Sequence, residues 1–526
     1  MLIIPLLLIY ALCGTAIFLQ PNHNTKVDFS SGNSTSSSAL PTGTPCAGNS
    51  PENRSQWCGY DIDTDWSEVV PDTGVTREYW LDIDEIAAAP DGYLRTVMAI
   101  NGSIPGPTIY ADWGDYVVVH VTNHLQEAKN GTSIHWHGMW QRGIKEHDGV
   151  TYCWRAMQYG SSWYHSHIGL QAWNGVFGGI IINGPATASY DEDAGVMILS
   201  DWTHETADEM YQFAQLCGPP ELPNALINGT NVFGSGNHTR GSRLKLQVTK
   251  GKSYRLRLVN AALDANFIFI IDNHKLTTIA MDLVPIELFS THPVTIGMGQ
   301  RYDIIITADQ ASLADSFWIR AIPLQACSEN ADPSNNRGIL HYEDTPSVPE
   351  TLSFIYPDET CDHIQAASLV PHVPKSVPPP NLQEMYFNST TMEILWEDPT
   401  LMQIYDGESA FPNSSAVISL PKADQWFYLD IETRQPIGHP IHLHGHDFFI
   451  LAQGQGSWDG SSRTENPPRR DTAMLPSNGS SGFALPFLER TDEVVSTIDY
   501  ELLQDTCESW MAYDELHNIV QEDSGV

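Results

Sequence analysis

The stretch TIYADWGDYVVVHVTN, Thr108–Asn123, sets the fold class of this chain. Short runs that alternate apolar and polar residues are punctuated there by Gly and Asn, which is the pattern of strands joined by turns. Similar runs occur at Gly178–Pro185, Arg243–Asn260 and Arg301–Ala308. Convincing long amphipathic helices are absent from the sequence. We therefore predict an all-β chain that is built from β-sandwiches.

The length of 526 residues predicts roughly three to four domains. One boundary is expected near Pro185–Val196, and another across the stiff, Pro-rich stretch PHVPKSVPPP, Pro371–Pro380. Residues 20–45 are rich in Ser, Thr, Asn and Pro, so they are expected to be flexible and to precede the first domain. The predicted organisation is a leader at 1–19, a flexible segment at 20–59, sandwich domains at 60–190 and 195–345, a Pro-rich linker at 346–380, and a third, incomplete sandwich domain at 381–526.

The composition restricts the partners of the chain. Its net charge is −38, with 64 acidic against 26 basic residues. Such a charge repels phosphate groups, so it argues against nucleic acid or an anionic membrane surface as a partner.

The beginning of the chain predicts secretion. An apolar, uncharged run from Leu2 to Leu19, with small residues near its end, is typical of a secretory signal peptide. A signal anchor is the alternative, but the run is near the lower length limit for a spanning helix and contains Pro5. We therefore expect a secreted, extracellular glycoprotein with no membrane contact after signal removal. Nine N-x-Ser/Thr sequons agree with this expectation: Asn33, Asn53, Asn101, Asn130, Asn228, Asn237, Asn388, Asn413 and Asn478.

Secretion makes disulfide bonds the default for the cysteines. Cys46 and Cys58 flank a short Pro/Asn/Gly-rich loop and are expected to pair, as are Cys327 and Cys361. Outside the leader this leaves an odd number of cysteines, whose pairing stays open: Cys153, Cys217 and Cys507.

Three clusters of paired histidines carry the chemistry. Side chains of a strand alternate between its faces, so the two histidines of each H-x-H pair point the same way. Imidazole is a ligand for copper, zinc, iron or nickel, and this many imidazoles fit a copper cluster better than one tetrahedral zinc ion. The clusters fall in the first and third predicted domains, so a metal site shared between two sandwiches is expected. The clusters are HWHG (His135, His137), WYHSH (His165, His167) and HPIHLHGH (His439, His442, His444).

Together with longer motifs, these clusters carry a family resemblance. NGSIPGPTI (Asn101–Ile109), HPIHLHGHDFFILAQG (His439–Gly454) and NPPRRDTAMLP (Asn466–Pro476) resemble segments of ascomycete-type laccases, members of the multicopper oxidase family. The resemblance implies three cupredoxin-like Greek-key domains and four copper ions, arranged as type 1, type 2 and binuclear type 3 sites. It also implies a monomer that oxidises small phenols in one-electron steps, coupled to reduction of dioxygen to water.

The resemblance assigns roles motif by motif. His439 resembles the type 1 ligand, and His135 and His442 resemble the type 2 pair. The remaining four histidines, His137, His165, His167 and His444, resemble type 3 ligands. Asp264 matches a carboxylate near the phenol pocket that accepts the phenolic proton, although an exposed loop aspartate is the alternative. Asp148 resembles an acid that relays protons near the cluster.

One expected motif is missing. The family's last copper motif, HCH and a following His, supplies the type 1 cysteine, but here LPSNG (Leu475–Gly479) runs directly into SSGFALPFLER (Ser480–Arg490). Roughly two strands of the third sandwich are absent, so type 1 copper is expected to be lost. Cys507, Met511 and His517 do not replace it, because their order and spacing are wrong.

Another stretch is missing between Val150 and Thr151. Clean excisions beside intact motifs favour mis-assigned introns or skipped exons over gradual decay. A continuous transcript without the HCH stretch would contradict this hypothesis. Three functions are compatible with the chain as written: an impaired laccase, a non-catalytic copper-binding protein, and a secreted sandwich protein without metal.

Overall fold

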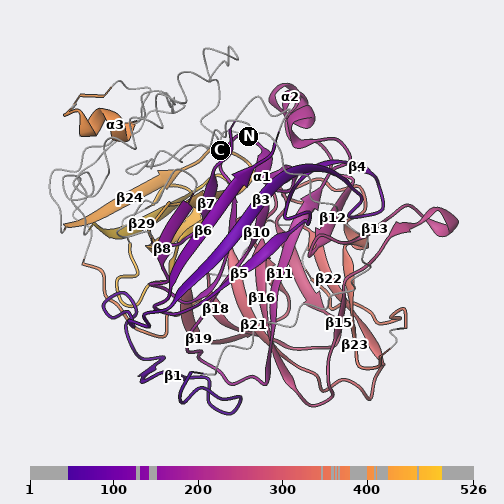
Figure 1. Cartoon of the computed structure of the whole chain (residues 1–526), viewed down its shortest axis with the longest axis horizontal. Coiled ribbons are helices and arrows are strands. Elements are labelled where there is room, and N and C mark those ends of the chain that lie inside the picture. Colours follow the sequence, from indigo (N-terminus) through magenta and orange to yellow (C-terminus); the bar gives the residue numbers. More distant parts are fainter. Residues whose placement is uncertain are drawn as a thin grey trace, which may run out of the picture.

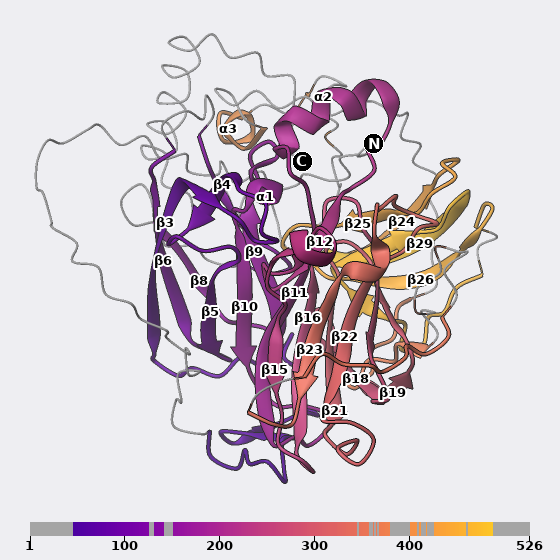
Figure 2. The same ribbon diagram turned by 90° about the vertical axis from the view of Figure 1, so that its right-hand side faces the viewer.

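The architecture comes from a computed structural model. The described residues are 46–125, 131–140, 151–344, 347–356, 368–378, 400–407, 425–458 and 461–487, with 361, 364, 410, 411 and 417. The predicted leader, Asp148 and Cys507 lie outside these residues. Within them, strands dominate, and the prediction of an all-β chain is confirmed. Figures 1 and 2 show three groups of strands, which run in colour from purple through pink to yellow.

The first sandwich consists of two four-stranded sheets. The stretch Thr108–Asn123 contributes to both sheets, because it contains most of β5, all of β6 and the turn between them. Trp113 occupies this turn, is fully buried, and donates its indole N–H to the carbonyl of Met157 at 3.0 Å. One sheet has the order β4 (Arg95–Ile100), β3 (Thr76–Ala88), β6 (Tyr116–Asn123), β8 (Thr151–Arg155); the other has β5 (Gly106–Asp112), β10 (Phe177–Asn183), β9 (Gly160–Ser166), β7 (Ile134–Trp136).

The second sandwich is the largest. Most of its ladders are antiparallel, but β11 pairs with β16, and β15 with β23, in parallel. Its six-stranded sheet has the order β12 (Asn224–Ile227), β11 (Glu192–Trp202), β16 (Ser253–Asn260), β21 (Arg301–Thr307), β18 (Leu276–Met281), β19 (Val284–Thr291). Its five-stranded sheet has the order β15 (Lys245–Gln247), β23 (Arg337–His341), β22 (Ser316–Pro323), β17 (Phe267–Ile271), β20 (Val294–Ile296).

The third sandwich has a four-stranded and a two-stranded sheet among the described residues. The larger sheet has the order β24 (Gln425–Glu432), β29 (Gly479–Phe487), β26 (Phe448–Gln455), β27 (Arg469–Arg470), and the smaller one pairs β25 (His439–His442) with β28 (Thr472–Leu475). The junction Gly479–Ser480, where the HCH stretch is missing, forms the beginning of β29. Ser480 pairs there with Glu432 on one side and Gly454 on the other.

The hydrophobic core explains how the sandwiches are joined. One continuous cluster of buried apolar residues runs from the first sandwich into the second, from Trp57 to Leu369. The third sandwich has a separate small core around Phe448 and Phe483. Its attachment to the rest of the molecule therefore depends more on polar contacts, and these lie at the candidate site.

Some local features extend beyond the sequence prediction. Helix α2 (Ala207–Cys217) begins at a capping box, in which Thr206 and Glu209 satisfy each other's backbone N–H groups. Two other short helices are α1 (Gln171–Asn174) and α3 (Thr400–Tyr405). No helix among the described residues is long and apolar enough to cross a membrane.

Both predicted disulfide bonds, Cys46–Cys58 and Cys327–Cys361, are confirmed. The first belongs to a stretch that we assigned to the flexible segment 20–59, and residues 46–59 of that segment form turns and one short strand. Strand β1 (Gln56–Trp57) pairs with β2 (Tyr60–Asp61), and Arg54 donates to the carbonyl of Tyr190 at 3.0 Å. The disulfide closes this stretch on itself. The bonds between Arg54 and Tyr190, and from the backbone N–H of Ala186 to the carbonyl of Arg54 at 2.8 Å, attach it to the segment that follows β10.

Candidate metal centre

Three strands carry the paired histidines to one place. β7 and β9 are antiparallel neighbours in the first sandwich, and His135 lies directly opposite His165 in their register. β25 belongs to the third sandwich and brings His442 to this pair. The Nε2 atoms of His135 and His442 are 3.3 Å apart, although the two residues are separated by 307 positions in the sequence. The predicted meeting of two sandwiches is thus present in the geometry.

Six imidazoles form the cluster. The rings of His135 and His444 stack with centroids 4.0 Å apart, and those of His137 and His442 stack at 3.8 Å. His167 lies 4.8 Å from His444, measured between ring centroids. The six members are His135, His137, His165, His167, His442 and His444.

The spacing of the ring nitrogens fits metal ligation. Two nitrogens that bind one metal ion at about 2 Å lie roughly 3–4 Å apart, and the His135–His442 separation falls in this range. Two overlapping groups of three have all their ligand atoms within 4.8 Å of one another: His135 with His442 and His444, and His135 with His137 and His165. Borderline metals such as copper are the ions that an all-imidazole set binds well.

Burial keeps these imidazoles neutral. It lowers the pKa of His165 to about 3 and that of His167 to about 4, with neighbouring histidines adding to the effect. Burial and the surrounding imidazoles also hold the pKa values of His135, His137 and His444 well below the ordinary range. A metal ion binds the neutral imidazole, so the site does not have to displace protons near neutral pH.

Polar neighbours determine which nitrogen of several rings is free. His165 Nδ1 bonds to the carbonyl of Ser166 at 2.8 Å, and His442 Nδ1 bonds to the carbonyl of Asp471 at 2.9 Å. His137 Nε2 contacts the hydroxyl of Thr472 at 3.0 Å, whereas its Nδ1 is buried without a hydrogen-bond partner among the described residues. A buried ring nitrogen without a hydrogen-bond partner, inside a group of imidazoles, has a lone pair free to bind a metal ion.

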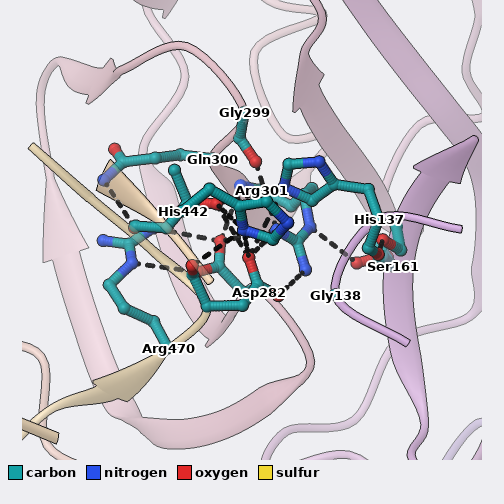
Figure 3. A network of polar contacts seen from close by, with 12 residues as sticks. His137, Gly138, Ser161, Asp282, Gly299, Gln300, Arg301, His442 and Arg470 are labelled. Atoms are coloured by element: carbon teal, nitrogen blue, oxygen red, sulfur yellow. Dashed lines mark hydrogen bonds and ion pairs between the residues drawn. The ribbon is translucent and has the colours of Figure 1, made fainter. Parts of the chain in front are cut away.

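The second sandwich supports the cluster without contributing a histidine. Arg301, at the start of β21, donates two hydrogen bonds to the carboxylate of Asp471 in the third sandwich. Nη1 lies 2.6 Å from Oδ1, and Nη2 lies 2.5 Å from Oδ2. Figure 3 shows this network between His137 on one side and His442 on the other. Burial alone raises the pKa of Asp471, but Arg301 outweighs it and holds that pKa well below the usual range.

His439 lies apart from the six. It begins β25 opposite Leu475 of β28, and its Nε2 is buried without a hydrogen-bond partner in the described part of the chain. No cysteine joins any group of potential metal ligands among the described residues. Four described cysteines form the two disulfides, Cys153 lies in β8, and Cys217 is exposed at the end of α2.

Asp264 is not the exposed loop aspartate that the sequence allowed as an alternative. It is half-buried, and its Oδ2 is buried without a hydrogen-bond partner among the described residues. Burial, together with the nearby carboxylate of Asp201, raises its pKa to about 6. Asp201 also holds the loop by accepting the backbone N–H of Asp264 at 2.8 Å.

The loop with Asp264 approaches the strand pair that contains His439. Gly297 lies between the two. A Cβ atom built on it would lie 2.5 Å from Met474 Sδ, in β28, and 3.2 Å from the side-chain oxygen of Asn266, two residues after Asp264. Met474 is the register partner of Pro440, the residue after His439. Asp148, the other predicted acid, lies outside the described residues. Sequence reasoning missed Arg301, Asp471 and Thr472, although RRDT stood within a quoted motif.

Comparisons with known proteins agree with this centre. Three family models described as multicopper oxidase match residues 82–187, 193–345 and 376–487. Laccase-2 of Botryotinia fuckeliana is 41% identical over 548 residues, covering 91% of this chain and 94% of that protein. Laccase-1 of Melanocarpus albomyces is 35% identical over 565 residues, covering 91% and 89%.

Solved structures give the same result. The crystal structure of laccase from Botrytis aclada is 40% identical, has a TM-score of 0.84, and covers 91% of this chain and 100% of that one. Fet3p, whose structure is described as a multicopper oxidase that functions in iron import, shares the fold at 21% identity and a TM-score of 0.69, over 83% and 95% of the chains. These relatives have cupredoxin-like domains, as predicted for this chain. The chain therefore belongs to the multicopper oxidase family, as a copper-dependent oxidoreductase of the ascomycete laccase type.

Proposed function

We propose that this protein is built for the laccase reaction, in which four phenols each lose one electron and one proton while one dioxygen takes up four of each and yields two waters. The observation that supports this most directly is the convergence of six neutral imidazoles from two sandwiches on one buried place. Bound copper supplies the one-electron chemistry. In this assignment His135 and His442 hold the type 2 ion, while His137, His165, His167 and His444 hold the type 3 pair.

Asp264 handles the phenolic proton in this proposal. With a pKa of about 6 it is mostly ionised at pH 7, so its free Oδ2 can accept the proton as the electron leaves. The closeness of Gly297 to both Asn266 and Met474 supports this role, because Asn266 follows Asp264 in its loop and Met474 pairs with Pro440, the residue after His439.

We further propose that the chain as written is impaired, since the HCH motif that would supply the type 1 cysteine is missing from the sequence and the type 1 site is incomplete. The alignment with Laccase-2 of Botryotinia fuckeliana supports missing segments. It runs over 548 positions, although the whole chain has 526 residues, so that relative has residues without a counterpart here.

The test is expression of the chain with copper, beside a version that carries the HCH stretch of a laccase relative between Gly479 and Ser480. The chain as written should bind copper, lack the intense thiolate–copper absorption, and oxidise phenols only at background rate. The restored version should show this absorption and consume one dioxygen for every four phenols. An intense band from the chain as written refutes the impairment, and a restored, blue protein that takes up no dioxygen with phenols refutes the oxidase assignment.

A second function follows from the same observation. The cluster of six imidazoles does not need His439, so a non-catalytic, secreted copper-binding protein is the alternative. Copper that stays bound through dialysis in the chain as written, without turnover, supports this reading. We also propose extracellular location and a monomeric state; the exposed sequons at Asn53 and Asn237 are open to glycosylation.

A further inference from the structure

Thr472 lies between the Arg301–Asp471 ion pair and the histidines of the metal centre. It is 1% exposed and begins β28, directly opposite His442 in the register. Its hydroxyl oxygen lies 3.0 Å from His137 Nε2, 3.1 Å from His442 Nδ1 and 2.8 Å from Asp471 Oδ1. One hydroxyl therefore contacts a histidine from the first sandwich, a histidine from the third, and a carboxylate.

The number of hydrogens decides the direction of these bonds. A threonine hydroxyl has one hydrogen to donate and two lone pairs to accept with. Asp471 is held as a carboxylate by two charge-assisted bonds from Arg301, so it can only accept. The hydrogen of Thr472 therefore goes to Asp471, and its two lone pairs are left for the N–H groups of His137 Nε2 and His442 Nδ1. The N–H of His442 is shared, because it also donates to the backbone carbonyl of Asp471 at 2.9 Å.

We propose that Thr472 is a positioning residue that sets the tautomer of His137 and, together with the backbone carbonyl of Asp471, that of His442, and so leaves His137 Nδ1 and His442 Nε2 bare for copper. Both bare nitrogens lie where ligation needs them. His137 Nδ1 is buried without a hydrogen-bond partner among the described residues, and His442 Nε2 lies 3.3 Å from His135 Nε2. The proposal rests on the proposed copper centre, because it specifies how two of its ligands are held.

The second sandwich holds Thr472 and Asp471 in position. Arg301 is fully buried and also donates to the backbone carbonyls of Ser161 at 3.3 Å and Gly299 at 3.1 Å. Gln300 donates its side-chain N–H to the backbone carbonyl of Thr472 at 3.2 Å. All three sandwiches thus contribute to the position of one hydroxyl, and Figure 3 shows Gln300 and Arg301 of the second sandwich beside His137 and His442.

The glycine of the HWHG motif makes room for this arrangement. A Cβ atom on Gly138 would lie 2.0 Å from Asp471 Oδ2 and 2.7 Å from an Arg301 nitrogen, and the φ of Gly138 is +72°. Only glycine leaves the space and adopts this backbone conformation without strain. The first sandwich is therefore shaped to receive the Arg301–Asp471 pair beside His137.

A direct metal-ligand role for Asp471 is the competing interpretation, since its oxygen lies within 4.8 Å of nitrogens of His137 and His442. Two features oppose it. Both carboxylate oxygens are already bonded to Arg301, and the guanidinium would repel a metal ion at that position. Asp471 Oδ1 also lies 3.6 Å from His137 Nε2 and from His442 Nδ1, which are the nitrogens that face away from the cluster.

The first test leaves Thr472 unchanged. In the copper-free protein with ¹⁵N-labelled histidine, nitrogen NMR distinguishes the two neutral tautomers, and assignment uses His137→Gln and His442→Gln samples. We expect His137 to carry its proton on Nε2 and His442 on Nδ1. A proton on Nδ1 of His137 or on Nε2 of His442 overturns the proposal.

The second test compares Thr472→Val, which keeps the shape and removes the hydroxyl, with Thr472→Ser, which keeps the hydroxyl. Thr278→Val is the matched control, because Thr278 is also buried in a strand but its hydroxyl has no hydrogen-bond partner among the described residues. Copper(II) is titrated into each protein, and binding is followed by electron paramagnetic resonance. Thr472→Val should bind roughly 10–100-fold more weakly with an altered spectrum, whereas Thr472→Ser and Thr278→Val should match the wild type.

Wild-type copper affinity and spectrum in a folded Thr472→Val protein overturn the proposal. If Thr472→Val does not fold, judged by circular dichroism, Thr472→Ala takes its place. Neither readout depends on phenol oxidation. A wild-type chain that never oxidises phenols therefore counts against the proposed function alone, and unchanged copper binding by the variant counts against Thr472 alone.

Discussion

Replacing Arg470 by methionine should weaken the attachment of the third sandwich. Arg470 is 3% exposed and bonds Asp282 of the second sandwich through Nε at 2.9 Å and Nη2 at 3.1 Å. It also donates to the hydroxyl of Tyr302 at 3.1 Å. Methionine fills much of the same volume but removes the charge, so Asp282 is left buried without its main partner.

The size of the effect follows from what Asp282 retains. Removing one partner of a buried ion pair costs about 3–5 kcal/mol, since the other charge stays buried. Asp282 still accepts the backbone N–H of Arg301 at 2.9 Å, and Arg301 Nη1 lies 3.5 Å away. This residual pairing of Asp282 favours the lower end of that range of destabilisation. The lost hydrogen bond from Arg470 to Tyr302 adds about 1 kcal/mol. We expect a total loss of roughly 3–4 kcal/mol in the free energy of unfolding.

Urea unfolding of the copper-free protein, followed by tryptophan fluorescence, measures this loss. The double variant Arg470→Met, Asp282→Asn removes both charges and should recover at least half of the stability. Lys252→Met is the control: Lys252 pairs with Glu192 on the surface, at 44% and 48% side-chain exposure, so its loss should change stability by less than about 0.5 kcal/mol. Equal stability of the double and single variants would refute the reasoning that an unpaired buried charge causes the loss.

Three further predictions concern the centre itself. The folded-state pKa values of about 3 for His165 and 4 for His167 lie below the ordinary 6.5, so the unfolded chain takes up protons that the folded chain does not. Stability of the copper-free protein should therefore fall as pH drops from 6.5 to 4, by about 1.4 kcal/mol per pH unit for each histidine. Urea unfolding midpoints at pH 7 and pH 5 measure this loss. A His165→Gln variant whose stability depends on pH as steeply as that of the wild type contradicts the prediction. Gly138→Ala should lower copper affinity at least tenfold, roughly the effect of a lost outer-shell contact, because the added methyl group meets Asp471; wild-type affinity in an equilibrium titration would show that the fit is loose. In the version with the restored HCH stretch, phenol oxidation should rise with pH through about 6 as Asp264 ionises, and Asp264→Asn should lower kcat roughly 100-fold and remove this dependence; an unchanged pH profile argues against the proton-accepting role.

The parts of the fold that the sequence predicted are those with a local signal. Strand alternation showed the sandwiches, and H-x-H spacing showed the ligand pairs, because both patterns lie within a few residues. The capping box of Thr206 and Glu209 was also local and could have revealed α2. Thr472 and His137, in contrast, are 335 positions apart, and nothing near either residue indicates the other. Their contact exists only because three sandwiches meet, so it depends on tertiary structure.

The same geometry separates the cluster of six imidazoles from the junction at Gly479. His442 and Thr472 lie opposite each other on β25 and β28, which form a sheet of their own, and Arg301 and Gln300 hold that sheet from the second sandwich. None of these contacts uses the junction at Gly479, where the HCH stretch is missing. We therefore expect the proposed loss of that stretch to remove ligands without removing the frame that orients the remaining imidazoles. We expect type 2 copper, whose pair His135 and His442 is complete, to bind even in the chain as written.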